Sequence, residues 1–168
     1  KYNVEGIIFS SSCTVYGQPD VLPVTESAPI KKAESPYGNT KQINEEIIRD
    51  TVASGAPINA IMLRYFNPIG AHPTALIGEL PNGVPQNLIP YLTQTAIGIR
   101  EKLSVFGDDY NTPDGSCIRD YIYVVDLAKA HVIAMDRILN HKQKDKVEVF
   151  NIGTGRGLSV LELIKAFE

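Results

Sequence analysis

The sequence has few cysteines, no excess of basic residues and no long apolar run, and each absence narrows what the protein can do. The net charge is −3 at pH 7, so no basic surface is available for nucleic-acid phosphates and we expect no nucleic-acid partner. Every apolar run is shorter than the roughly 20 residues that cross a bilayer, so we expect no membrane insertion. Two cysteines, Cys13 and Cys117, are too few for a disulfide framework and favour a reducing, cytoplasmic setting.

Histidine is also scarce. His72, His131 and His141 show no metal-ligand spacing, so we expect no metal site. His131 lies on the apolar side of a predicted helix and is interpreted as a satisfied core or boundary residue. With 168 residues, 43% of them hydrophobic and 21% charged, the chain has an ordinary globular composition and the length of one domain.

One helix is predicted with clear start and stop signals. Ser35 is a good N-cap, Pro36 suits the first helical position, and Gly55-Ala56-Pro57 ends the pattern. Tyr37 and Lys41, four residues apart, then lie on one face of this helix. An ammonium beside a phenol favours the phenolate, which can act as a general base. With 8 tyrosines in the chain such a pair also arises by chance, so the neighbouring motifs must decide its meaning.

Three short apolar runs predict buried strands of a parallel α/β sheet, over residues 4–9, 58–65 and 147–152. The first run leads into Ser10–Thr14 and the second into Phe66–Gly70. Because α/β sheets place their ligands at the carboxyl ends of parallel strands, we expect a site where these polar and aromatic side chains gather.

The remaining elements are predicted from apolar spacing and caps. We expect a helix over residues 87–100, short strands over 104–106 and 117–125, a helix capped by Asp126, and a final helix with a Ser159/Glu162 capping box. Gly153-x-Gly155 follows a strand, but Leu158 stands where a third phosphate-loop glycine would be. We therefore interpret it as a tight turn rather than a phosphate cradle.

Taken together, the motifs strongly resemble the UDP-galactose 4-epimerase family of the extended short-chain dehydrogenase/reductase superfamily. The resemblance covers practically the whole chain and is carried by Ser-Ser-Ser-Cys-Thr-Val-Tyr-Gly (10–17), Ser-Pro-Tyr-Gly-Asn-Thr-Lys (35–41), Leu-Arg-Tyr-Phe-Asn-Pro-Ile-Gly-Ala-His-Pro (63–73), Gly-Val-Pro-Gln-Asn-Leu-Ile-Pro-Tyr (83–91), Val-Phe-Gly-Asp-Asp-Tyr (105–110), Asp-Gly-Ser-Cys-Ile-Arg-Asp-Tyr-Ile (114–122) and Asn-Ile-Gly-Thr-Gly (151–155). It implies epimerisation at the sugar C4 of UDP-galactose and UDP-glucose, with NAD as the cofactor and a 4-keto intermediate.

The resemblance also implies roles for the catalytic and cofactor-binding residues. Tyr37 would be the base that takes the proton of the C4 hydroxyl, and Lys41 would support it and hold the nicotinamide ribose. Ser12 would hydrogen-bond the same sugar hydroxyl and help to pass the proton. Tyr65 and Phe66 would lie by the cofactor, with Phe66 at the nicotinamide.

A second set of residues would bind the UDP-sugar. By the same resemblance Thr14 would lie close to the sugar, Asn67 and Asn87 would grip the sugar nucleotide, and Arg119 would pair with the diphosphate. Ser104, Val105 and Phe106 would receive the uracil, with Phe106 stacking on it. These side chains suit their tasks, because an Arg fork matches a diphosphate and an aromatic face matches a planar base.

The implied fold is part of a Rossmann-type doubly wound parallel sheet plus a smaller α/β substrate-binding region. We expect residues 1–66 and about 119–140 to belong to the dinucleotide-binding domain, and residues 67–118 and about 145–168 to the UDP-sugar-binding region. The family's N-terminal glycine loop and C-terminal segment have no counterpart here. We therefore expect these residues to be part of a longer chain that forms a homodimer, and expect this stretch alone not to bind NAD.

Three positions depart from the family pattern, namely Asn39, Gln86 and Tyr123, and we expect Tyr123 to be structural. A nucleotide-sugar 4,6-dehydratase is the alternative among enzymes, although related dehydratases carry an acidic pair where Ser12-Cys13 stands. A non-catalytic chain with a structural or binding role is the alternative outside enzymes. A glycine loop encoded upstream would favour the epimerase.

Overall fold

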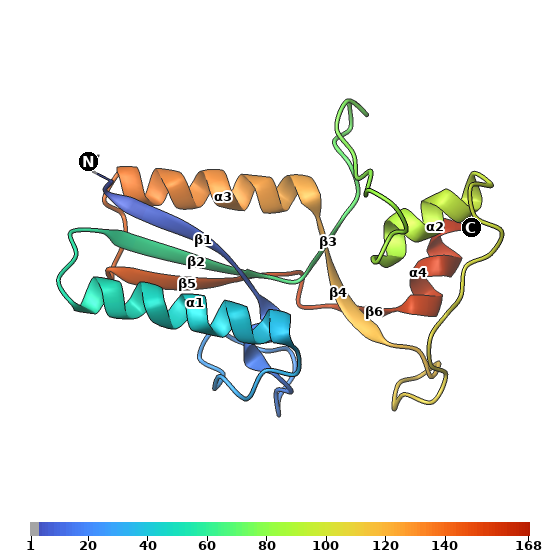
Figure 1. Ribbon diagram of the computed structural model, residues 1–168, viewed down its shortest axis with the longest axis horizontal. Coiled ribbons are helices and arrows are strands. Elements are labelled where there is room, and N and C mark those ends of the chain that lie inside the picture. Colours follow the sequence, from blue (N-terminus) through green and yellow to red (C-terminus); the bar gives the residue numbers. More distant parts are fainter. Residues whose placement is uncertain (1–3) are drawn as a thin grey trace.

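The computed structural model describes residues 4–168 and shows an α/β protein with two three-stranded sheets (Figure 1). The first sheet is wholly parallel and has the strand order β1-β2-β5, formed by β1 (Gly6–Ser12), β2 (Asn59–Tyr65) and β5 (Val147–Ile152). All three strands lie within or next to the runs predicted to be strands. The prediction of a parallel α/β sheet is therefore confirmed.

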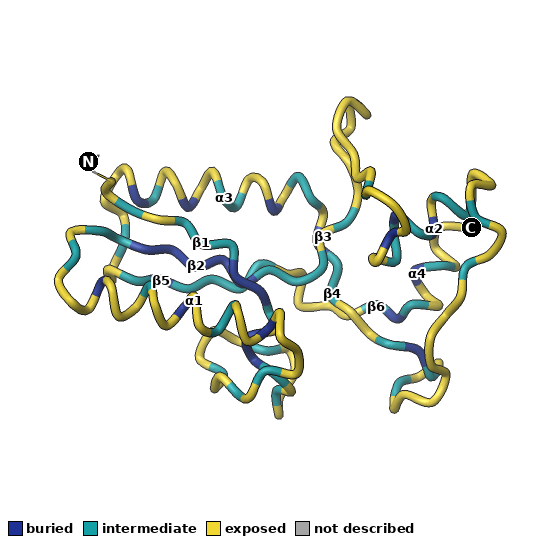
Figure 2. Tube along the Cα trace, viewed as in Figure 1, coloured by how far each residue is buried: buried dark blue, intermediate teal, exposed yellow. Residues whose placement is uncertain are grey.

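A long helix covers each face of this sheet, α1 (Pro36–Ala53) on one side and α3 (Val124–Leu139) on the other (Figure 1). Because side chains alternate along a strand, β2 presents Ile61 and Leu63 to α3, where they pack with Ala134 and Ile138 in the hydrophobic core. Figure 2 shows the burial concentrated along β2 and the end of β1. The central strand is thus buried on both faces, as in Rossmann-type sheets.

The start of α1 is fixed by its own sequence. The Ser35 side chain accepts a hydrogen bond from the Gly38 amide at 3.1 Å, and Pro36 occupies the first turn. After the C-cap Ser54, Gly55 takes a φ of +96°, a conformation that favours glycine and turns the chain away from the helix. The predicted helix and both of its signals are confirmed.

The second sheet lies at the other end of the molecule and is built from short strands (Figure 1). β3 (Asn67–Ile69) pairs in parallel with β4 (Ile118–Tyr123), and β4 pairs antiparallel with β6 (Gly157–Ser159). Two helices accompany it, α2 (Leu88–Ala96) and α4 (Val160–Phe167). Only Phe66 separates β2 from β3, so the two sheets are closely connected.

Several contacts agree with interpretations made from the sequence. The predicted capping box of α4 is present, with Ser159 and Glu162 bonding each other's backbone amides. His131 has a partner on each ring nitrogen, since Nδ1 lies 2.9 Å from the Leu127 carbonyl and Nε2 lies 3.2 Å from Ser10 Oγ. The Tyr123 hydroxyl donates to the Ala71 carbonyl at 2.9 Å, which is a structural contact.

Other boundaries differ from the predicted ones. Residues 104–106 form no strand, because Val105 and Phe106 are exposed and no neighbouring strand pairs with them. α2 ends at Ala96, four residues before the predicted end. α3 begins at Val124, so Asp126 lies in its first turn and bonds Lys129 instead of capping the helix. The serine-rich segment extends β1 to Ser12 and is followed by the 3-10 helix η1 (Cys13–Tyr16).

The strands are also distributed differently from the expected domain division. β4, placed in the first region from the sequence, lies in the second sheet, whereas β5, placed in the second region, is an edge strand of the first sheet. The chain therefore crosses between the sheets after β2, after β4 and after β5. Within residues 4–168 none of the helices has both the length and the apolarity that a membrane span requires.

The first prediction concerns the core between β2 and α3. Ile61→Ala should lower the free energy of unfolding by about 2 to 5 kcal/mol, because it removes three carbons of a fully buried side chain. Leu76→Ala is the control, since Leu76 is exposed in a loop and its replacement should change stability by less than about 0.5 kcal/mol. Urea unfolding measures both variants. Equal effects would contradict the placement of the core.

Candidate active site

The carboxyl ends of β1, β2 and β5 meet at one edge of the first sheet. In the strand register Ser12 lies opposite Tyr65, and Tyr65 lies opposite Ile152. The Phe66 amide then donates to the Ile152 carbonyl at 3.2 Å, so the pairing of β2 with β5 continues past the end of the strands. Ser12, Tyr65 and Phe66 are thereby placed at the sheet edge where α/β proteins bind their ligands.

Tyr37 and Lys41 reach this edge from the first two turns of α1. The Lys41 ammonium lies 5.4 Å from the centre of the Tyr37 ring and donates to the Ser10 carbonyl at 2.8 Å. It also lies 5.2 Å from the centre of the Phe9 ring. Tyr37 is 53% exposed, so its phenol is accessible to a ligand while Lys41 stays anchored between helix and strand.

Ser12 and Thr14 lie at the turn that follows β1. Ser12 is buried, and its hydroxyl oxygen accepts a hydrogen bond from the Thr14 amide at 3.2 Å, capping η1. A Cβ on Gly38 would stand only 3.3 Å from the Thr14 carbonyl oxygen. The absence of a side chain at Gly38 therefore lets the start of α1 approach the end of β1, which brings Tyr37 and Lys41 towards Ser12.

A cavity of about 1040 Å³ lies beside the second sheet. Six of the eight residues predicted to bind the UDP-sugar line it, namely Asn67, Asn87, Ser104, Val105, Phe106 and Arg119. The other two, Ser12 and Thr14, lie at the turn after β1 and do not line it. Its lining does not include the catalytic and cofactor-binding candidates Ser12, Tyr37, Lys41, Tyr65 and Phe66. The structure thus gathers the predicted residues in two groups rather than one.

Asn67 links the two groups, because it follows Phe66 directly and lines the cavity. Its side-chain amide donates to the Asp120 carbonyl at 3.0 Å, which fixes it against β4. On the neighbouring wall Arg119 carries the positive charge, and Phe106 is 86% exposed with its ring available for stacking. The cavity therefore offers a cation, the side-chain amides of Asn67, Gln86 and Asn87, and an aromatic face, which suits a phosphate-bearing ligand with a planar group.

The Gly153–Gly155 segment is occupied by a side chain of the protein itself. The Asp120 carboxylate accepts hydrogen bonds from the Thr154 amide at 2.9 Å, from the Gly155 amide at 2.8 Å and from the Thr154 hydroxyl at 2.7 Å. These donors are already used, which argues against a phosphate cradle. The segment is a short loop from β5 to the strand β6, so the tight turn expected between a strand and a helix is not formed. Asp120 also ties the end of β5 to β4 and so joins the two sheets beside Arg119.

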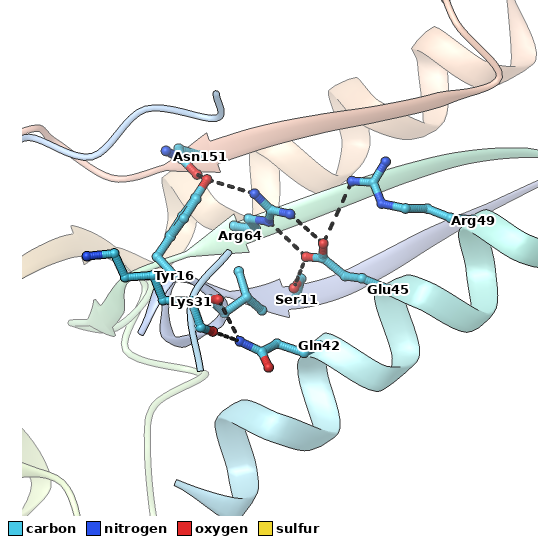
Figure 3. A network of polar contacts seen from close by, with 9 residues as sticks. Ser11, Tyr16, Lys31, Gln42, Glu45, Arg49, Arg64 and Asn151 are labelled. Atoms are coloured by element: carbon cyan, nitrogen blue, oxygen red, sulfur yellow. Dashed lines mark hydrogen bonds and ion pairs between the residues drawn. The ribbon is translucent and has the colours of Figure 1, made fainter. Parts of the chain in front are cut away.

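A buried polar network beneath the site escaped the sequence analysis (Figure 3). Arg64 in β2 binds Glu45 in α1 through two bonds, Nε to Oε1 at 2.8 Å and Nη2 to Oε2 at 2.5 Å. Ser11 in β1 donates to Glu45 Oε1 at 2.6 Å. Arg64 Nη1 also donates to the Tyr16 hydroxyl at 2.9 Å, which in turn donates to Asn151 Oδ1 at 2.6 Å.

These contacts determine the charge state of the pair. Burial by itself raises the pKa of Glu45, but hydrogen bonds from Arg64 and Ser11 outweigh burial and hold that pKa below its ordinary value. Burial likewise lowers the pKa of Arg64, while its bonds to Glu45 and Tyr16 raise it above the ordinary value. Both groups therefore remain charged, although each is less than 5% exposed.

The sequence did hold a signal for this network. Arg64 interrupts an otherwise apolar strand, and a charged residue in a strand covered on both faces needs a buried partner. Glu45 lies one turn after Lys41 on the same face of the predicted helix. Which acid would meet Arg64 depends on how α1 is placed against the sheet, and that placement is a tertiary contact.

Comparisons with known proteins identify close relatives. Residues 1–153 match the model of the "NAD dependent epimerase/dehydratase family". Across all 168 residues the chain is 54% identical to the UDP-glucose 4-epimerase of Dictyostelium discoideum, of which it spans 48%. Among solved structures, UDP-glucose 4-epimerase from Bifidobacterium longum in complex with NAD+ and UDP superposes with a TM-score of 0.91 at 51% identity, covering 98% of this chain and 48% of that one.

A second solved structure is similarly close. UDP-glucose-4-epimerase from Stenotrophomonas maltophila, with bound NAD and formylated UDP-arabinopyranose, has a TM-score of 0.90 at 50% identity. It too matches 98% of this chain and 48% of its own length. The chain thus spans about half the length of the relatives that it matches.

The second prediction tests the charge of Glu45. Glu45→Gln should lower the free energy of unfolding by about 3 to 5 kcal/mol at neutral pH, because it leaves the buried Arg64 without a counter-charge. The folded-state pKa of Glu45 lies below its ordinary value of 4.5, so its contribution is complete above that pH and is lost as the pH falls through the folded-state pKa. The gap between wild type and variant should therefore narrow in acid.

Urea unfolding of both proteins between neutral and acidic pH measures this gap. Glu46→Gln, an exposed change at the next position of the same helix, is the matched control and should have little effect at any pH. A gap between wild type and Glu45→Gln that stays constant down to the acid limit of folding would contradict the ionised pair.

Proposed function

The chain belongs to the NAD dependent epimerase/dehydratase family, and we propose that its protein interconverts UDP-galactose and UDP-glucose with NAD as cofactor. The observation that carries the proposal is the pairing of an accessible Tyr37 and an anchored Lys41 at the strand ends with a neighbouring cavity that suits a sugar nucleotide. The relatives named above support it, because they are UDP-glucose 4-epimerases and their similarity extends over 98% or more of this chain. Since the chain spans about half of them, the proposal concerns the whole protein.

In the proposed reaction Tyr37 takes the proton of the sugar C4 hydroxyl. Its neighbour Lys41 is fixed to the Ser10 carbonyl and would stay in place while the proton moves. The Ser12 hydroxyl lies at the same strand end and would hydrogen-bond the C4 oxygen, which helps to pass the proton, with Thr14 next to the sugar. In the second half of the reaction Tyr37 would return the proton to the C4 oxygen, which completes the inverted C4 hydroxyl.

The residues at the strand ends fit one end of the cofactor. Hydroxyl and ammonium donors on Tyr37, Lys41 and Ser12 suit the hydroxyls of a ribose. Tyr65 and Phe66 would lie by the cofactor, with Phe66 at the nicotinamide. When bound, NAD would accept the C4 hydride and return it to the opposite face of the 4-keto sugar.

The cavity would hold the rest of the sugar nucleotide. Asn67 and Asn87 would bind the sugar and diphosphate, and the guanidinium of Arg119 would pair with the diphosphate. The segment Ser104 to Phe106 would receive the uracil, with the exposed Phe106 ring stacking on the base. We propose that the first sheet with α1 and α3 serves dinucleotide binding and that the cavity region serves UDP-sugar binding.

We propose further that the protein acts as a homodimer in the cytoplasm. α1 supports the dimer, because its Ile43 and Ile47 are 45% and 56% exposed on a helix that would gain from an apolar partner. Cys13 and Cys117 are both free thiols, which fits a reducing compartment. Size-exclusion chromatography with light scattering tests the dimer, and a monomeric mass for the active protein would contradict it.

The third prediction is the activity itself. The full-length protein, supplied with NAD and UDP-galactose, should form UDP-glucose until the two sugars reach equilibrium, as chromatography of the nucleotide sugars would measure. Formation of a 4-keto-6-deoxy sugar instead would favour the dehydratase alternative. A folded, NAD-bearing protein that changes neither sugar nucleotide would overturn the proposed function.

The fourth prediction tests the general base. Tyr37→Phe should lower kcat by about 100-fold to 10,000-fold, because the hydroxyl that accepts the proton is gone while the ring remains. KM should change little, since the cavity residues are untouched. Thr51→Ala is the control, as it removes a hydroxyl from the far end of the same helix. Steady-state kinetics decide, and a kcat within two-fold of wild type would exclude Tyr37 as the base.

A further inference from the structure

Two consecutive residues of β1 are tied to two consecutive turns of α1. The Ser10 carbonyl accepts a hydrogen bond from Lys41 Nζ at 2.8 Å. The Ser11 hydroxyl donates to Glu45 Oε1 at 2.6 Å (Figure 3). Ser10 and Ser11 are the two residues before Ser12 in β1. Sliding the helix along the strand by even one residue would break both ties at once, so together they define a single register.

Of the two helix residues, Glu45 also binds a second strand through its side chain. Its two carboxylate oxygens bind Arg64 in the neighbouring β2, one residue before Tyr65 and two before Phe66. The planar guanidinium and carboxylate match in a fork-to-fork geometry that tolerates little rotation or translation. Through Glu45 the helix is therefore located against both strands whose ends carry the candidate site.

We propose that Glu45 is a positioning residue, which through Ser11 and Arg64 sets the register of α1 and thereby the place of Tyr37 and Lys41 relative to Ser12. This inference rests on the proposed function. Tyr37 lies two turns before Glu45, about 12 Å along the helix axis. Because the intervening helix is continuous, a displacement at Glu45 is carried to the phenol nearly undiminished.

A purely stabilising role is the competing explanation. Buried ion pairs often contribute little net stability, because the cost of desolvation offsets their attraction. A fully bonded pair such as this one therefore favours a role in positioning α1 over a role in stabilising the fold. The chain contains a second bidentate pair for comparison. Arg137 of α3 binds Glu148 of β5 at 2.5 and 2.7 Å, again joining a helix to a strand, but at the opposite ends of those strands from the site.

The experiment compares Glu45→Gln with Glu148→Gln in the full-length protein. Stability, NAD content, kcat and the KM for UDP-galactose are measured for both. We expect both variants to lose stability and keep their NAD. Only Glu45→Gln should lower kcat, by 10-fold or more, because Tyr37 is displaced. Its KM for UDP-galactose should stay within two-fold of wild type, because the cavity is intact. Unchanged kcat in Glu45→Gln, or an equal loss in Glu148→Gln, overturns the inference.

Ser11→Ala keeps the test decisive if Glu45→Gln does not fold. It removes one hydroxyl and leaves both bonds from Arg64 to Glu45, so the protein should fold normally. We expect kcat to fall 3-fold to 10-fold at constant KM, with recovery in Ser11→Thr, which restores a hydroxyl. A kcat of Ser11→Ala equal to wild type overturns the inference.

Failure of the proposed function is recognised separately. In that case wild type itself makes no UDP-glucose, and the crystal structures of wild type and Ser11→Ala decide the positioning role without activity. We expect α1 to shift along β1 in the variant, with the Lys41 to Ser10 contact lengthened. An unshifted helix overturns the inference.

Discussion

The ion pair between Glu45 and Arg64 constrains how α1 packs against the first sheet. Each charge is buried, and an unpaired charge at either place would be strongly destabilising, so α1 can settle only where the carboxylate meets the guanidinium. Arg64 in turn is held by Tyr16 from η1, and Tyr16 by Asn151 from β5. One network thus aligns α1, η1 and all three strands of the sheet at the edge where the site lies.

A second set of contacts joins this edge to the cavity. Phe66 alone connects β2 with β3, and the Asp120 carboxylate fastens the loop after β5 to β4. Asn67 and Arg119 are neighbours of these two residues in sequence and line the cavity. Backbone pairing and the half-buried Asp120 thereby hold Tyr37 and Lys41, at the strand ends, in a fixed relation to the side chains that line the cavity.

Local signals in the sequence predicted the elements that depend on local chemistry. Ser35 and Pro36 marked the start of α1, and Ser159 with Glu162 marked the start of α4, because caps are formed by neighbouring residues. The apolar runs of β1, β2 and β5 predicted a parallel sheet, because strands covered on both faces need continuous hydrophobicity. The resemblance to a known family supplied the candidate site residues and their roles.

Features that depend on distant residues were not predictable in the same way. Val105 and Phe106 have strand-forming side chains, but no second strand pairs with them, so they remain an exposed loop. Which sheet β4 and β5 join depends on where the chain passes from one sheet to the other, and the spacing of apolar residues does not encode this. The contact between Glu45 and Arg64, which are 19 positions apart in the sequence, likewise depends on how the helix packs against the strand.

We propose that the strand-end residues and the cavity together form one site for a sugar nucleotide. A crystal structure of the full-length Tyr37→Phe variant with NAD and UDP-galactose tests it most directly. We expect the uracil against Phe106, the diphosphate at Arg119 and the sugar C4 hydroxyl within hydrogen-bonding reach of Ser12, beside the Phe ring at position 37. A sugar nucleotide bound outside the cavity, or with its C4 far from Ser12, would contradict it.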